Sequence, residues 1–236
     1  MVRGRQHSPQ RPPTDRRYWA MLGAAILHLV CVLILVASTQ TGLPTWEVNG
    51  LQGLHRWAKP SLDQLAWMIT GWGTHWGTLP LFTIGVLFLA GQRQWRKLAY
   101  WVGAIGGTAG VAALLKLLWH RDRPDLWPSV LPPDRYPTDW SFPSGHAAAS
   151  LSLVATLWIL NGQSRRPDRW RWPIGLLGSG FVLVIAWTRL YLGVHWVTDI
   201  LGGWSLALIG VVGLSIALFP ADQNAYPHSN REDSAG

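Results

Sequence analysis

The side chains that could do chemistry are concentrated in three short segments of this 236-residue sequence. From them we select three cations, two histidines, a carboxylate and a short turn rich in small residues. Fixed cations suit a tetrahedral dianion such as phosphate, and a pair of imidazoles can divide into a nucleophile and an acid. The segments are Lys116 to Arg123 and Pro124, then Pro143-Ser144-Gly145-His146, and then Arg189, His195 and Asp199.

The first segment places Lys116 and Arg123 seven residues apart, just before Pro124. If a helix continues through both, they lie two turns apart on one face, and Pro124 then ends the helix. The alternative is a lysine that extends its ammonium to the membrane interface beside an ordinary basic loop.

The second segment has the features of a helix N-terminus that binds an anion. Ser144 is a suitable N-cap, and Gly145 permits a ligand to approach the backbone. Free N–H groups and the helix dipole attract negative charge there, and His146 would lie on the first turn beside that anion. A well-capped helix with an incidental histidine is the alternative.

The third segment pairs His195 with Asp199 at a spacing of i to i+4, so the two side chains can form a hydrogen bond on one helical face. A carboxylate inside an apolar segment is costly and points to function. Its role would be to hold the imidazole in one tautomer and to stabilise its cationic form. A purely structural pair is one alternative. Metal ligation is another, although the nearby cations would repel a divalent ion.

Long apolar segments must position these groups. Charged residues make up only 14% of the chain, against about 25% in soluble domains, and apolar residues make up 49%. Lengths near 20 residues match the hydrocarbon core of a bilayer. The sequence therefore predicts an all-α integral membrane bundle of six transmembrane helices. They are Trp19–Ser38, Leu65–Ala90 (interrupted by glycines and Pro80, with the span itself starting near Trp76), Leu98–Leu118, Ala147–Leu160, Trp172–Trp187 and Trp196–Phe219.

The distribution of cations predicts the orientation of this bundle. Thirteen of the 20 Lys and Arg residues fall on one side if the N-terminus is cytoplasmic, and positive charge is retained on that side. Both termini are then cytoplasmic, and the three polar segments lie at the outer face. We expect one membrane domain over residues 19–219 between disordered cytoplasmic tails at 1–18 and 220–236.

The composition also excludes several classes of protein. A net charge of +8 is compatible with nucleic-acid binding, but the cations flank apolar segments instead of forming a patch on a soluble fold. High hydrophobicity excludes a disordered chain. With Cys31 alone, an intramolecular disulfide and a multi-cysteine metal site are both excluded.

The order K-x6-R-P, P-S-G-H and R-x5-H-x3-D resembles the pattern of the type-2 phosphatidic acid phosphatase (PAP2) superfamily, which includes the vanadium haloperoxidases. The motifs cover residues 116–199, and the helix layout extends the likeness to most of the chain. One departure is Thr188, which stands where the family usually has serine and keeps the hydroxyl.

The resemblance implies a lipid phosphatase that uses no metal or other cofactor and has its site at the outer membrane face. His195 would attack phosphorus to form a phosphohistidine, Asp199 would stabilise the imidazolium, and His146 would protonate the leaving group. The implied phosphate-binding groups are Lys116, Arg123, Ser144, Gly145 and Arg189.

The substrate stays open at this point between phosphatidic acid, phosphatidylglycerol phosphate and undecaprenyl pyrophosphate. Lipids are the expected partners, and the sequence indicates no oligomeric state. A phosphate or lipid transporter without catalytic activity, built on the same cations, is the alternative function. Transporters usually show repeats and broken helices at the membrane midplane, whereas these polar residues gather at one face.

Overall fold

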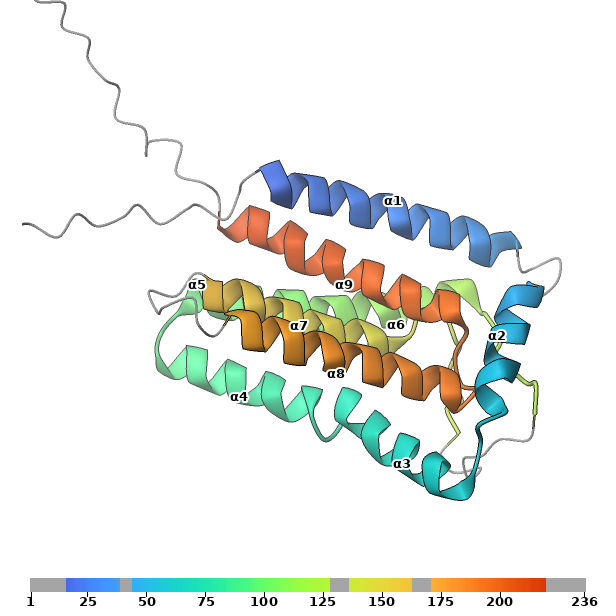
Figure 1. The fold of residues 1–236 in the computed structure, drawn as a ribbon. Helices are drawn as coiled ribbons and strands as arrows, with labels where there is room; N and C mark the ends of the chain where they lie inside the picture. The colour runs from blue at the N-terminus through green and yellow to red at the C-terminus, as the bar shows by residue number, and fades with distance from the viewer. Residues whose placement is uncertain (1–15, 39–43, 128–135, 163–170, 220–236) are drawn as a thin grey trace, which may run out of the picture.

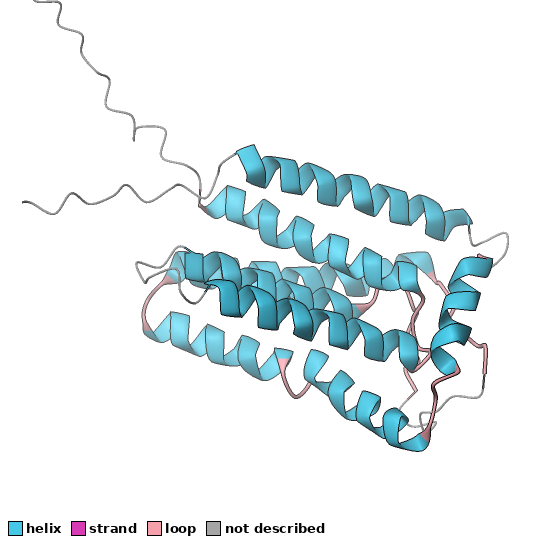
Figure 2. Ribbon diagram, viewed as in Figure 1, coloured by secondary structure: helices cyan, strands magenta, loops and turns pink. Residues whose placement is uncertain are grey.

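The computed structural model describes residues 16–38, 44–127, 136–162 and 171–219, and every regular element within these ranges is helical (Figure 2). The prediction of an all-α fold is confirmed. Residues 1–15 and 220–236, which hold most of the two predicted tails, lie outside the described ranges. The elements are α1 (Arg16–Ser38), α2 (Thr45–His55), α3 (Pro60–Thr70), the 3₁₀ turn η2 (Gly71–Gly73), α4 (Thr78–Gly91), α5 (Trp95–Trp101), the π-helical η3 (Val102–Gly107), α6 (Thr108–Trp119), α7 (Gly145–Gly162), α8 (Arg171–Tyr191) and α9 (Val197–Leu218).

The long helices run alongside one another, and the short helix α2 lies across one end of them (Figure 1). At the centre, α9 packs against α1 and α7, and α7 also packs against α8. Small residues make these approaches close. A Cβ atom on Gly203 of α9 would lie 2.6 Å from the carbonyl oxygen of Ser144, so only glycine allows the start of α7 to contact α9 there.

Five helical stretches among the described residues are long and apolar enough to cross a membrane. Helix α7 is not among them, although its 18 residues match a span in length, and its buried face carries serine and threonine side chains. Ser152 donates to the carbonyl of Ala148 at 2.7 Å, so its hydroxyl is satisfied within the helix. The predicted multi-pass bundle is confirmed, and the predicted number of six transmembrane helices is approximate. The five stretches are Arg16–Ser38, Pro60–Gly91, Trp95–Trp119, Trp172–Tyr191 and Val197–Leu218.

The second span is interrupted where the glycines predict it. Helix α3 ends at Thr70, the turn η2 follows, and α4 starts only at Thr78. In Figure 1 the two helices follow one line with a gap between them. A Cβ on Gly73 would lie 3.1 Å from Cδ2 of His146, so this interruption packs directly against the start of α7.

Candidate active site

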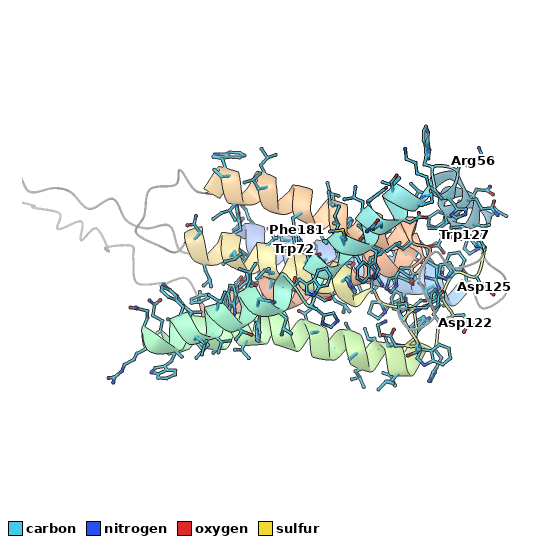
Figure 3. The ribbon with its side chains drawn as sticks, turned by 90° about the horizontal axis from the view of Figure 1, so that it is seen from below. Arg56, Trp72, Asp122, Asp125, Trp127 and Phe181 are labelled. Atoms are coloured by element: carbon cyan, nitrogen blue, oxygen red, sulfur yellow. The ribbon has the colours of Figure 1, made fainter. Side chains whose placement is uncertain are left out.

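The structure brings the polar residues of all three motifs to one end of the bundle. They come from the end of α6, the segments that follow it, the start of α7, the end of α8 and the start of α9. Figure 3 shows the loop residues Asp122, Asp125 and Trp127 at that same end, near Arg56 at the end of α2. We call six of these residues the polar cluster: Lys116, Arg123, His146, Arg189, His195 and Asp199.

His195 and Asp199 form the predicted pair, although His195 lies outside the helix. Helix α9 starts at Val197 with Trp196 as its N-cap, so His195 belongs to the preceding turn and does not open the helix. That turn needs Gly193, whose φ of 65° favours glycine. His195 Nδ1 lies 3.2 Å from Asp199 Oδ2, which also accepts the Trp196 backbone N–H at 2.9 Å.

The surroundings of His195 favour a neutral imidazole. The side chain is only 2% exposed, and burial lowers its pKa well below the usual 6.5. The positive charges of Arg123, Arg189 and Lys116 lower that pKa further. Its other ring nitrogen, Nε2, lies 3.4 Å from NH1 of Arg123. Because Nδ1 faces a carboxylate and Nε2 faces a cation, Nε2 is the nitrogen with a lone pair for attack.

Lys116 and Arg123 converge, but not along a continuous helix. Helix α6 ends at Trp119, one residue beyond the predicted span, and His120 takes a left-handed conformation with φ 49°, so the helix does not continue from Lys116 to Arg123. Arg123 returns to Lys116 through the loop instead. Both cations bind Asp139: Lys116 Nζ lies 2.8 Å from Oδ2, and Arg123 NH2 lies 2.5 Å from Oδ1.

Asp139 therefore holds the two cations that the sequence assigns to phosphate. Its side chain is 57% exposed. Burial acts to raise the pKa of Asp139, but hydrogen bonds and charges from Lys116 and Arg123 outweigh that effect and hold the pKa below its usual 3.8. The carboxylate is accordingly ionised at neutral pH. It makes the kind of contact with these cations that a phosphate oxygen would make.

Arg189 is buried and incompletely bonded. Its side chain is 4% exposed, and NH1 donates to the hydroxyl of Thr70 at 2.9 Å. Its Nε has no hydrogen-bond partner among the described residues. A buried guanidinium N–H without a partner is costly, and an anion in the site would satisfy it.

The start of α7 has the predicted geometry. Ser144 is fully buried, its Oγ accepts the N–H of Ala147 at 3.5 Å, and its own N–H donates to the carbonyl of Asp199 at 3.0 Å. A Cβ on Gly145 would meet no atom within 4 Å, so open space lies beside this backbone. His146 lies on the first turn, with Nε2 3.3 Å from the hydroxyl of Thr74.

Two residues behind Asp199 were not predicted from the sequence. Arg121 donates to Asp199 Oδ1 at 2.6 Å, and its NH2 lies 2.8 Å from Oε2 of Glu47 on α2. All three side chains are buried. One available signal was that Glu47 is an isolated acidic residue in an otherwise uncharged stretch, from Arg17 to His55.

An apolar cavity of about 680 Å³ lies between α7 and α8, apart from the polar cluster. Its walls include Val154 and Trp158 on α7 and Gly175 on α8. None of its lining residues belongs to the polar cluster, so this cavity is separate from the candidate site.

Comparisons with known proteins give relatives of one kind. Phosphatidylglycerophosphatase B of Bacillus subtilis is 29% identical over 157 residues, which cover 64% of this chain and 72% of that protein. An undecaprenyl-diphosphatase of Sulfolobus acidocaldarius is 34% identical over 70 residues, and the putative undecaprenyl-diphosphatase YbjG of Escherichia coli is 30% identical over 141 residues. These two matches span 30% and 65% of the relatives' own lengths.

Solved structures share the fold. The transmembrane PAP2 type phosphatidylglycerolphosphate phosphatase from Bacillus subtilis superposes with a TM-score of 0.69 at 24% identity, covering 81% of this chain and 94% of that one. Aquifex aeolicus LpxE gives a TM-score of 0.52 at 21% identity, covering 72% and 94%. The PAP2 superfamily model matches residues 97–222, which is more than half of the chain and includes the whole polar cluster. The chain belongs to the PAP2 superfamily.

Proposed function

We propose that this protein is a membrane phosphatase that hydrolyses a lipid phosphate or pyrophosphate through a phosphohistidine intermediate, without a metal ion. The observation that carries the proposal is the environment of His195: a buried imidazole with its pKa lowered, backed by Asp199 and surrounded by three cations. The relatives named as phosphatidylglycerophosphatase and undecaprenyl-diphosphatase support a lipid substrate.

In the first step His195 Nε2 attacks phosphorus, so that a P–N bond forms while the bond to the leaving oxygen breaks. His146 donates its proton to that oxygen. The non-bridging oxygens are held by Lys116, Arg123 and Arg189, and by the backbone N–H groups at the start of α7. The unpartnered Nε of Arg189 and the open space at Gly145 both support an anion in this position.

In the second step a water molecule attacks the phosphohistidine. His146, now neutral, accepts the proton of this water, the P–N bond breaks, and inorganic phosphate leaves. His195 returns to the neutral imidazole, and Asp199 stabilises the imidazolium that exists between the two steps.

We further propose that the polar cluster lies at the outer face of the membrane and that both termini are cytoplasmic. The distribution of cations supports this, because thirteen of the 20 Lys and Arg residues then lie on the inner side. Cysteine labelling on intact cells would test it. A cysteine introduced at exposed Trp57 should react with an impermeant maleimide, whereas one at exposed Arg93 should not.

The function is tested by phosphate release from the purified protein in detergent with EDTA present. Phosphatidic acid, phosphatidylglycerol phosphate and undecaprenyl pyrophosphate form the substrate panel. We expect release from at least one of them, and none from a His195→Gln variant. Binding of these lipids without release would favour a transporter, and activity that EDTA removes and magnesium restores would contradict the metal-free mechanism.

The role of His146 predicts a dependence on the leaving group. His146→Gln should lower turnover of an alkyl phosphate by roughly 10²–10⁴-fold, because the alkoxide needs a proton as it departs. Turnover of p-nitrophenyl phosphate, whose phenolate leaves without protonation, should fall far less. Rates for both substrates on both proteins measure this difference, and equal losses would show that His146 is not the acid.

The contact of Asp139 with both cations predicts competition with the substrate. Asp139→Asn should lower KM roughly three- to tenfold with kcat unchanged, because exposed ion pairs contribute about 0.2–1 kcal/mol each. The pKa of Asp139 is held below 3.8, so the carboxylate is charged throughout the working range. The KM ratio should therefore be constant between about pH 5 and 8.

The matched control for this prediction is Asp125→Asn, an exposed carboxylate in the segment that follows α6. Its KM should equal that of the wild type. A higher KM in Asp139→Asn would mean that this carboxylate organises the two cations for phosphate instead of competing with it.

A further inference from the structure

Glu47 and Arg121 form a buried ion pair behind His195 and Asp199, and the contacts of this pair indicate more than a packing role. Arg121 NH1 donates to Asp199 Oδ1 and to the Thr198 hydroxyl, both at 2.6 Å. Its NH2 lies 2.8 Å from Glu47 Oε2. Glu47 and Asp199 are fully buried and Arg121 is 4% exposed, so solvent screens these charges very little.

Glu47 is itself fixed to the first turn of α9. Its Oε1 accepts both the backbone N–H and the hydroxyl of Thr198, each at 2.9 Å. One carboxylate on α2 thus binds the arginine and the helical turn that carries Asp199. Arg121 also lies over the Trp196 ring, 5.5 Å from its centroid. These contacts leave Arg121 little freedom to move.

This arrangement controls the direction of the Asp199 carboxylate. Oδ2 receives the Trp196 N–H and faces His195 Nδ1, while Oδ1 receives Arg121. With a donor on each oxygen, rotation about the Cβ–Cγ bond is restricted. Without Arg121, Oδ1 of Asp199 would lose its ion-pair partner, and the Asp199 carboxylate could turn away from His195.

The charges have a second consequence. Arg121 alone would cancel the formal charge of Asp199 and weaken its effect on His195. Glu47 supplies a second negative charge, so Glu47, Arg121 and Asp199 together carry a formal charge of −1. Conversion of His195 to an imidazolium brings this buried group to neutrality.

We propose that Glu47 and Arg121 are positioning residues for the phosphatase reaction. They hold the Asp199 carboxylate in the orientation that activates His195, and together with Asp199 they give the buried group its net charge of −1. The proposal rests on the function proposed above. Neither residue touches the substrate, and both act through Asp199.

Glu47→Gln tests the charge with little change of shape. We expect kcat to fall roughly 10- to 100-fold, by analogy with the loss when the hydrogen-bond partners of metal-binding histidines are removed, while KM stays within about threefold. Arg56→Gln is the matched control, since Arg56 is exposed at the end of the same helix, and it should keep the wild-type kcat. A wild-type kcat in Glu47→Gln would contradict the proposal.

The double variant Glu47→Gln/Arg121→Met separates positioning from folding. Removing Glu47 and Arg121 together keeps the formal charge of the buried group at −1, so the double variant tests orientation, and the thermal midpoint reports the cost of leaving Asp199 without its ion pair. Positioning predicts that kcat nevertheless stays at least tenfold low when normalised to folded protein. A double variant with a normal midpoint and normal kcat would reduce the pair to a structural role.

An NMR measurement tests the positioning even if the wild type releases no phosphate, in which case only the proposed function fails. In ¹⁵N-histidine-labelled protein, the Nδ1–H proton of His195 reports its hydrogen bond to Asp199, and a His195→Gln sample assigns it. We expect this resonance to shift or broaden in the double variant and to be unchanged in Arg56→Gln. An unchanged resonance in the double variant would overturn the positioning role.

Discussion

Replacing His195 by glutamine is expected to abolish turnover, with a loss of at least about 10⁴-fold, because the proposed reaction has no other nucleophile. Glutamine has a similar size and can still donate to Asp199, so the fold should survive. Incubation with ³²P-labelled substrate followed by alkaline denaturation measures the intermediate directly. Alkali-stable, protein-bound phosphate should be present in the wild type and absent in the variant.

The pH profile adds a further check on His195. Burial and the three cations lower its pKa, so the attacking neutral form persists as the pH falls, and the acid limb of kcat/KM should lie below 6.5. His28→Gln is a suitable control, since His28 bonds Ser205 between α1 and α9, outside the polar cluster. Normal turnover in His195→Gln, or labelled phosphate still bound to it, would require another nucleophile.

Replacing Arg189 by lysine is expected to lower kcat about 10²–10³-fold, the typical cost of losing one donor aimed at the developing charge. Lysine keeps the positive charge but not the planar set of donors. Arg189 NH1 already donates a hydrogen bond to the Thr70 hydroxyl, whereas its buried Nε has no partner among the described residues. Nε is therefore the donor that would bind a phosphate oxygen.

The control for Arg189 is Thr70→Val, which removes one bond to the guanidinium but leaves its charge and donors. Its kcat should fall less than tenfold. Steady-state kcat and KM for both variants, on the lipid that the wild type prefers, give the comparison. Equal kcat values in wild type and Arg189→Lys would show that charge alone suffices at this position.

The parts of the site that follow from local chemistry were predictable. His195 and Asp199, four residues apart, lie 3.2 Å from each other as predicted, although His195 precedes the helix, and α7 begins at Gly145 directly after Ser144 as their residue types suggest. Apolar runs gave the helices for a similar reason, since a bilayer requires a fixed length of apolar residues. The apolar run Ala147–Leu160 predicted helix α7, although α7 is not among the five clear spans and its buried face carries serines and a threonine.

What the sequence did not reveal depends on contacts between distant segments. Glu47 and Arg121 are 74 residues apart, and no local periodicity links them. The path of the chain from Lys116 to Arg123 was also not evident: the predicted span ends at Leu118, next to the observed helix end at Trp119, but no residue type before Pro124 shows that His120 adopts the left-handed conformation. Arg123 therefore meets Lys116 through a loop and through Asp139, a residue whose position depends on the tertiary fold.

The packing of α2 also bears on how the protein matures. The buried group behind His195 takes Glu47 from α2, Arg121 from the segment after α6, and Asp199 from α9, which is the last helix of the described chain. During synthesis the first two are made long before the third. A nascent chain can therefore insert most of its helices before His195 has been synthesised or has made its contact with Asp199. With the proposed site, we expect hydrolytic competence to arise only once α9 is in place.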